Sequence, residues 1–233
     1  MNDRAHSVSV VVPVLNEEAR IGELLDALDS VPGIHEVIVV DGASTDRTAG
    51  IVRARGGAKL LSAGRGRASQ MNAGAEIATG DVLLFLHADV RLPRDAASRI
   101  AAALADPGVV AGAFRTWTVC EEARSWLGPF LHLADLRSRY TGLPYGDQAL
   151  FVRAAVFKQL GGFPDQPLME DLELSRRLRG VGRVRTVAAT VRVSGRRFLA
   201  RPAYYVFVVN VFPLLYRLGV SPRALANLYG NPR

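Results

Sequence analysis

Four short apolar runs alternate with helical patterns over the first hundred residues, and this alternation constrains the fold more than any other feature. The runs cover residues 8–14, 37–40, 59–61 and 82–86. The first is rich in β-branched residues, and the last is continuously apolar, as strands buried on both faces are. Strands that alternate with helices through short connections form βαβ units and a parallel sheet. The sequence therefore predicts an α/β fold, with a mostly parallel central sheet and helices on both faces.

After residue 109 the pattern becomes less regular. We expect strands at residues 109–119, 149–152 and 183–193, the last at a sheet edge, and helices at residues 121–139, 171–178 and 203–218. The 233-residue chain shows no internal repeat and no low-complexity linker. We therefore expect one domain over residues 1–199 and a basic, aromatic helical extension over residues 200–233.

Charge is divided unevenly along the chain. Residues 174–233 contain 12 arginines and no acidic residue. Such a segment indicates an anionic neighbour: a diphosphate, an acidic acceptor, a lipid surface or a nucleic acid. The aromatic helix within it can lie on a membrane or pack against the domain or a second subunit. Peripheral membrane contact and a homodimer through residues 200–220 therefore both stay open.

Cysteine content and hydropathy bear on the compartment. Cys120 is the single cysteine, so no internal disulfide can form, which is typical of a reducing compartment. The longest uncharged stretch, residues 202–216, has 15 residues and is interrupted by Pro213. A spanning helix needs about 20 apolar residues. We expect a soluble cytoplasmic protein, with peripheral contact on the inner face of the membrane as the alternative.

Polar side chains follow three of the predicted strands at their carboxyl ends. Asn16 and Glu17 follow the first strand, Asp41 ends the second, and Asp89 follows the fourth. Carboxyl ends of parallel strands meet at the edge where α/β sheets bind ligands. A divalent cation is commonly held there by one or two carboxylates and phosphate oxygens, which makes Asp89 a candidate ligand. The alternatives are local: Asn16 as a helix N-cap and Asp41 in an ordinary turn.

A glycine turn follows the third predicted strand. Arg65 and Arg67 lie in it at the start of a helix, where they can meet a phosphate or a base edge. A solvated turn is the alternative. The spacing is neither that of a P-loop nor that of a dinucleotide fingerprint.

Taken together, these segments resemble the family 2 glycosyltransferases with the GT-A fold. The resemblance covers residues 7–182 and rests on residues 13–17, 41–46, 86–89, 161–163 and 170–178. It implies a nucleotide-binding half over about residues 7–106 and an acceptor half over about residues 107–199. The Gln-x-x-Arg-Trp signature of processive members is absent from the sequence. We therefore expect the small non-processive branch, which moves one sugar from a nucleotide-diphosphate sugar to each acceptor.

The resemblance also implies a donor site. It assigns the nucleotide base of a donor, with a UDP-sugar favoured, to Pro13, Asn16, Glu17 and Asp41, and places Arg65 or Arg67 beside the base or the diphosphate. His87, Ala88 and Asp89 match the Asp-x-Asp motif of the family. Asp89 would bind the Mn²⁺ or Mg²⁺ that bridges the diphosphate. His87 stands where the motif has its first acid, which weakens metal binding or makes it depend on the donor.

Asp171 matches the catalytic base of the family. It would take a proton from an acceptor hydroxyl as that oxygen attacks the anomeric carbon, with inversion, and Glu170 would position it. A helix-capping pair is the alternative for these two acids. Asp147 and Gln148, in the turn before residues 149–152, would contact the sugar or the acceptor or else stabilise that turn. The acceptor is unidentified, and a lipid-linked one would suit the basic extension.

Two other functions stay open. A sugar nucleotidyltransferase shares the fold, but the first strand lacks the glycine- and arginine-rich loop that grips a triphosphate. A catalytically silent nucleotide-sugar-binding protein is the second alternative, because His87 replaces an acid. Neither the resemblance nor the motifs call for a nucleic acid, so none is expected as a partner.

Overall fold

The computed structural model describes residues 6–119, 144–195 and 202–229. Cys120 and the predicted helix at residues 121–139 lie outside these ranges. The described strands form one eight-stranded sheet in the order β3-β2-β1-β4-β7-β6-β8-β5. They are β1 (Val8–Val14), β2 (Ile34–Asp41), β3 (Lys59–Ser62), β4 (Val82–Phe85), β5 (Val90–Arg91), β6 (Val109–Val119), β7 (Phe151–Arg153) and β8 (Arg183–Ser194).

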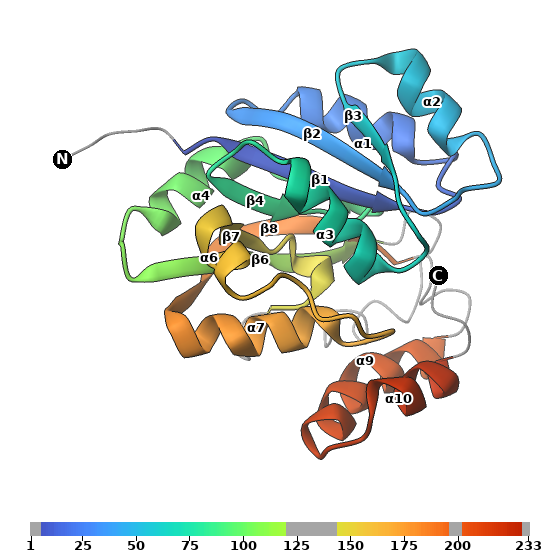
Figure 1. Cartoon of the computed structure of the whole chain (residues 1–233), viewed down its shortest axis with the longest axis vertical. Helices are drawn as coiled ribbons and strands as arrows, with labels where there is room; N and C mark the ends of the chain where they lie inside the picture. Colours follow the sequence, from blue (N-terminus) through green and yellow to red (C-terminus); the bar gives the residue numbers. More distant parts are fainter. Residues whose placement is uncertain (1–5, 120–143, 196–201, 230–233) are drawn as a thin grey trace.

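Helices cover this sheet on both faces (Figure 1). They are α1 (Ile21–Asp29), α2 (Thr48–Arg55), α3 (Arg67–Ile77), α4 (Ala96–Leu104), α6 (Ala154–Gln159), α7 (Glu170–Val181), α9 (Pro202–Arg217), α10 (Pro222–Tyr229) and the 3₁₀ turn η1 (Gly146–Gln148). Alternate residues of β1 explain the two layers, because successive strand side chains point to opposite faces. Val10 and Val12 pack with Leu24 of α1, whereas Val11 packs with Met71 of α3.

The strand pairings divide the sheet into two parts. From β3 to β4 all pairs are parallel, and β7 then runs antiparallel to both β4 and β6. β8 pairs in parallel with β6 along almost its whole length. The prediction of an α/β fold with a mostly parallel sheet is confirmed, but β8 is not the edge strand. Two residues of β5 pair antiparallel with its carboxyl end and form the edge there.

The carboxylate of Glu36 links the amino ends of three strands. It accepts hydrogen bonds from Ser9 of β1 at 2.6 Å, from the Thr79 backbone at 2.7 Å and from Lys59 of β3 at 2.6 Å. Burial by itself would raise the pKa of Glu36, but the bonds from Lys59, Ser9 and Thr79 together lower it to about 2.

We expect Glu36→Gln to lower the free energy of unfolding by about 2 kcal/mol at pH 7, because a neutral amide then faces the Lys59 ammonium. A depressed carboxyl pKa stabilises the fold above its unfolded value, 4.5, and this contribution is lost as the pH falls toward 2. The deficit of the variant should therefore shrink between pH 5 and pH 2. Denaturant unfolding at several pH values measures it, with Glu23→Gln, an exposed acid, as the control. A deficit that does not change with pH would contradict this assignment.

The C-terminal extension packs beside α7 (Figure 1). The predicted helix at residues 203–218 is confirmed as α9. With α10 it forms a separate apolar cluster whose buried members are Leu168, Val208, Phe212, Leu225 and Ala226. The Tyr216 hydroxyl donates a hydrogen bond to Glu173 of α7 at 3.2 Å. Within the described part of the chain, no helix combines the length and apolar character needed to span a bilayer.

Candidate active site

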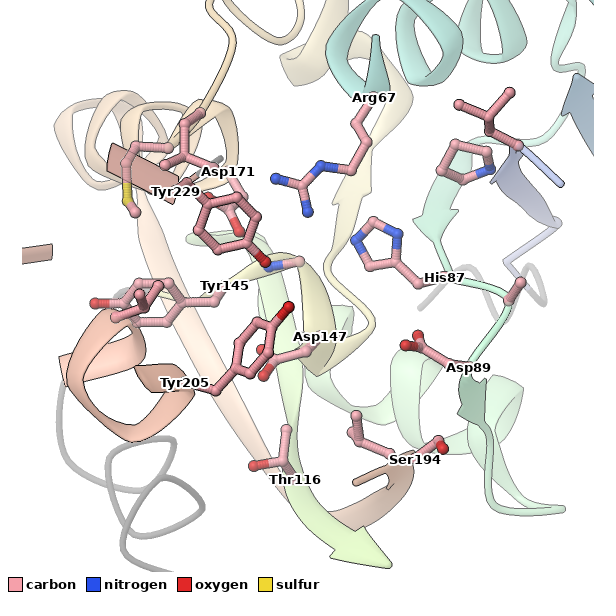
Figure 2. Close-up of a pocket in the computed structure, with 18 of the residues that line it drawn as sticks. Arg67, His87, Asp89, Thr116, Tyr145, Asp147, Asp171, Ser194, Tyr205 and Tyr229 are labelled. Carbon is pink, nitrogen blue, oxygen red and sulfur yellow. The ribbon is translucent and has the colours of Figure 1, made fainter. Parts of the chain in front are cut away.

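A cavity of about 240 Å³ opens where β1 and β4 end (Figure 2). Segments far apart in the sequence line it: the turn after β1, the start of α3, the turn after β4, η1, the start of α7 and the C-terminal helices. Eight of the predicted site residues are among its lining: Pro13, Glu17, Arg67, His87, Ala88, Asp89, Asp147 and Asp171. Most of the predicted site residues thus lie around one cavity.

The turn after β1 is tied to the turn after β2. Asn16 has a left-handed backbone with φ of 54°, and its side-chain oxygen accepts a hydrogen bond from the Thr45 backbone at 2.8 Å. Its own backbone N–H donates to Ser44 at 2.9 Å. The alternative of Asn16 as a helix N-cap is wrong, since α1 begins at Ile21. Asn16 lines a groove next to the cavity rather than the cavity itself.

Asp41 is a predicted donor residue that lines neither the cavity nor the neighbouring groove. It is buried, and its carboxylate accepts hydrogen bonds from the hydroxyl of Ser44 at 2.5 Å and from its backbone N–H at 3.2 Å. Gln70 of α3 lines the cavity instead and donates to the Val14 and Val40 carbonyls, both at 2.8 Å. Nothing in the sequence pattern singles out Gln70.

The two arginines of the glycine turn occupy different positions. Arg67 borders both the cavity and the neighbouring groove, whereas Arg65 lines only the groove. Arg67 forms a 3.0 Å ion pair with Glu170, which is 2 % exposed. Burial raises the pKa of Glu170, and the charge of Arg67 opposes that rise. Glu170 in turn raises the pKa of Arg67. Glu170 therefore holds Arg67 rather than facing the cavity.

His87 and Asp89 project into the cavity from the turn after β4 (Figure 2). Backbone bonds fix this turn: the Val90 N–H donates to the His87 carbonyl, and the Ser194 N–H donates to the Asp89 carbonyl, both at 3.0 Å. Among the described residues, no cluster of three His, Cys, Asp or Glu side chains could hold a metal ion. One carboxylate fits a hard cation that completes its coordination with diphosphate oxygens and water. The donor set at Asp89 thus fits a cation shared with a bound diphosphate.

Asp171 is held by two backbone donors. The Leu172 N–H donates to its Oδ1 at 2.7 Å, and the Gly146 N–H donates to its Oδ2 at 2.5 Å. A Cβ at position 146 would lie 2.6 Å from His87 Nε2 and 3.2 Å from Asp171 Oδ2. Glycine is therefore required where η1 passes between these two side chains. Asp147 lines the cavity, while Gln148 is buried and does not line it.

Aromatic residues that the sequence did not single out form another wall. Tyr145, Tyr205 and Tyr229 line the cavity across from His87 and Asp89 (Figure 2). Two of them belong to the C-terminal helices. The aromatic composition of residues 203–218 predicted a helix, but not which of its side chains would reach the cavity.

Backbone strain collects in the turns around the cavity. In the described part of the chain, four non-glycine residues have positive φ: Asn16, Ala43, Ala149 and Met169. Each of these four residues lies within three positions of a predicted site residue in the sequence. Such conformations cost about 1–3 kcal/mol each and persist where the surroundings fix them, commonly at functional sites. The local geometry thus agrees with the cavity as the site.

A family model for glycosyl transferase family 2 matches residues 9–161. The chain belongs to this family. The glycosyltransferase is 34 % identical over 158 residues to the undecaprenyl-phosphate 4-deoxy-4-formamido-L-arabinose transferase of Pseudomonas paraeruginosa, a match that covers 63 % of this chain and 46 % of the relative. It is 28 % identical over 202 residues to the probable glycosyltransferase YdaM of Bacillus subtilis. That match covers 75 % of this chain and 47 % of the relative. The chain thus spans about half the length of these curated relatives.

Solved structures agree on the fold. The mannosyltransferase PcManGT from Pyrobaculum calidifontis, in complex with GDP-Man and Mn²⁺, matches with a TM-score of 0.65 and 27 % identity, over 82 % of this chain and 57 % of the other. S. aureus TarS in complex with UDP-GlcNAc matches with a TM-score of 0.63 and 22 % identity, over 81 % of this chain and 58 % of TarS. The predicted GT-A fold is confirmed.

Proposed function

We propose that this enzyme transfers one sugar, with inversion, from a nucleoside-diphosphate sugar to an acceptor hydroxyl. The observation that carries the proposal is that Asp89, after β4, and Asp171, at the start of α7, line one cavity together with Arg67 and His87. The cavity lies at the carboxyl ends of the parallel strands, where α/β sheets bind nucleotides.

The donor would lie against the turn after β1 and the turn after β4. Pro13 and Glu17 line the base side, and Arg67 supplies a positive charge beside the diphosphate. Asp89 would hold Mn²⁺ or Mg²⁺ there, and the ion, when bound, neutralises charge on the leaving diphosphate. The complex of PcManGT with GDP-Man and Mn²⁺ supports this arrangement. A UDP-sugar remains the favoured donor, and the neighbours extend the candidates to GDP-sugars.

Asp171 would act as the general base. Its two backbone N–H donors fix the orientation of its carboxylate toward the cavity. The acceptor oxygen forms a bond to the anomeric carbon as the bond to the diphosphate breaks, and the hydroxyl proton passes to Asp171. Attack from the face opposite the diphosphate inverts the anomeric carbon. The nucleoside diphosphate leaves with the electron pair of the broken bond.

The acceptor side would combine Asp147 with the aromatic wall. We propose an acceptor hydroxyl on a lipid-linked molecule, reached from the cytoplasm at the inner face of the membrane, because several relatives are named undecaprenyl-phosphate sugar transferases. In this assignment residues 7–106 form the nucleotide half and residues 107–199 the acceptor half. Residues 200–233 are an extension that completes the acceptor wall through Tyr205 and Tyr229.

A thermal-shift panel of UDP-, GDP- and dTDP-sugars, each with and without Mn²⁺, tests donor binding. The correct donor at one hundred times its Kd should stabilise the fold by about 2.7 kcal/mol and raise Tm by about 5–10 °C, only with the metal. Slow release of nucleoside diphosphate from that donor would then show turnover. Pyrophosphate release from a nucleoside triphosphate and a sugar phosphate would instead identify a nucleotidyltransferase. Binding without any turnover would identify a silent nucleotide-sugar-binding protein.

A further inference from the structure

Helix α9 presents two unlike faces. Its inner face contributes Tyr205 and Val208 to the cavity and Phe212 to the cluster that packs beside α7. Its outer face exposes large apolar side chains to solvent. We name three of these the outer stripe: Phe207, Leu214 and Leu218, which are 52 %, 55 % and 73 % exposed.

The spacing of the outer stripe makes it one continuous surface. Phe207 and Leu214 stand at positions i and i+7 of α9, which fall on a single face. Leu218 directly follows the helix, and its backbone N–H still donates to the Leu214 carbonyl at 3.0 Å, so it extends the same face. Leu228 of α10 is 64 % exposed, so both C-terminal helices present leucine to solvent. Elsewhere in the described ranges, exposed large apolar residues are single and belong to different elements: Ile77, Trp117 and Val181. The outer stripe is thus a concentrated apolar surface without a partner in the described residues.

The charged groups near the end of the outer stripe are mostly arginines. Arg217 ends α9 beside Leu218, and Arg223 lies on α10; both are exposed. The acid that shares a groove with Arg217 is Glu173, which is already paired with Arg176 and Arg177. No acidic residue occurs anywhere in residues 174–233, whereas 12 arginines do. An apolar helix face bordered by arginines suits the interface of an anionic bilayer, where leucine and phenylalanine enter the acyl boundary and guanidinium groups meet phosphate.

We propose that the outer stripe docks on an anionic lipid surface. A second copy of the chain fits the outer stripe less well. In a dimer with two-fold symmetry, the same surface of each copy faces that of the other. Arg217 of each copy would then approach that of the other, with no acid after Glu173 to pair with either. Docking also has a geometric consequence. The helix that touches lipid on one face lines the cavity with the other, so the cavity wall lies within one helix diameter of the bilayer.

Co-sedimentation of the full chain with vesicles tests this surface. We expect binding to vesicles of phosphatidylcholine and phosphatidylglycerol in equal amounts, about tenfold weaker binding to phosphatidylcholine alone, and a further weakening by high salt. The double variant Leu214→Ser/Leu218→Ser should bind the mixed vesicles at least about tenfold more weakly than the wild type. The matched control Ile77→Ser/Val181→Ser also removes two exposed apolar side chains, and it should bind like the wild type.

Folding and activity are measured separately from docking. The stripe variant should keep the wild-type circular dichroism and Tm, because it alters only exposed side chains, and it should release nucleoside diphosphate from the donor at the wild-type rate. Equal vesicle binding by wild type and stripe variant, or no sedimentation of the wild type, would overturn the proposal. It would equally be overturned by a dimer in size-exclusion light scattering that the stripe variant abolishes, since the occupant would then be a second copy.

Discussion

An Asp171→Asn enzyme is expected to keep its fold and its donor affinity while transfer to an acceptor hydroxyl slows by about 10³-fold, within the range that a positioned general base contributes. The amide oxygen of asparagine can accept one of the two backbone N–H bonds, but its NH₂ group cannot accept the other. We therefore also expect a loss of about 1 kcal/mol in the free energy of unfolding.

Steady-state kinetics separate these effects. The fall should appear in kcat, with KM for the donor nearly unchanged, because Asp171 acts on the acceptor proton and not on the diphosphate. Asp95→Asn replaces an exposed aspartate at the start of α4, away from the cavity, and should leave kcat unchanged. A fall of less than about tenfold for Asp171→Asn would mean that the nucleophile needs no base. A phosphate monoester is such a nucleophile, because its second pKa, near 6, leaves it ionised.

Replacement of Asp89 is expected to have a comparably large effect through the diphosphate. In the proposed function, Asp89 is the carboxylate that would hold a cation shared with the diphosphate. We expect Asp89→Asn to lower kcat/KM by about 10³-fold, which corresponds to about 4 kcal/mol of lost transition-state stabilisation. The concentration of Mn²⁺ needed for half-maximal activity should also rise.

A comparison with His87→Asn tests whether this effect belongs to the carboxylate. His87 lines the same cavity two residues earlier, but it stands where the family motif has an acid. We expect its replacement to change the Mn²⁺ requirement far less than Asp89→Asn does. Equal Mn²⁺ requirements for the wild type and Asp89→Asn would contradict the assignment of Asp89. Titration of initial rates with Mn²⁺ supplies both comparisons.

Sequence reasoning predicts those parts of the site that depend on the arrangement of strands. Asp89 and the turn at Pro13 and Glu17 were predicted because parallel strands must end at one edge of the sheet. The structure brings all three residues to the cavity there. The match to the family predicts Asp171, and the structure adds the two backbone donors that orient it. The apolar periodicity that defines the strands is strong enough to fix these positions.

The differences between prediction and structure concern side chains whose partners lie within three residues or far away in the chain. Asp41 ends its strand as predicted, but its carboxylate accepts a hydrogen bond from the nearby Ser44 hydroxyl. The spacing of residues in the sequence does not reveal this bond. Gln148 shares a turn with Asp147, yet the 3₁₀ geometry buries one and exposes the other to the cavity. Tyr205 reaches the site only because α9 folds back beside α7, and composition does not encode that packing.

Crystals grown with a nucleoside diphosphate and Mn²⁺ would test the central claim most directly, through the anomalous signal of manganese. The claim is that Asp89, after β4, and Asp171, at the start of α7, face one cavity that binds the diphosphate of the donor. It predicts a manganese peak within coordination distance of Asp89 and of the diphosphate oxygens, with Asp171 lining the same cavity. A nucleotide bound wholly in the groove beside Arg65, or a manganese peak away from Asp89, would contradict it.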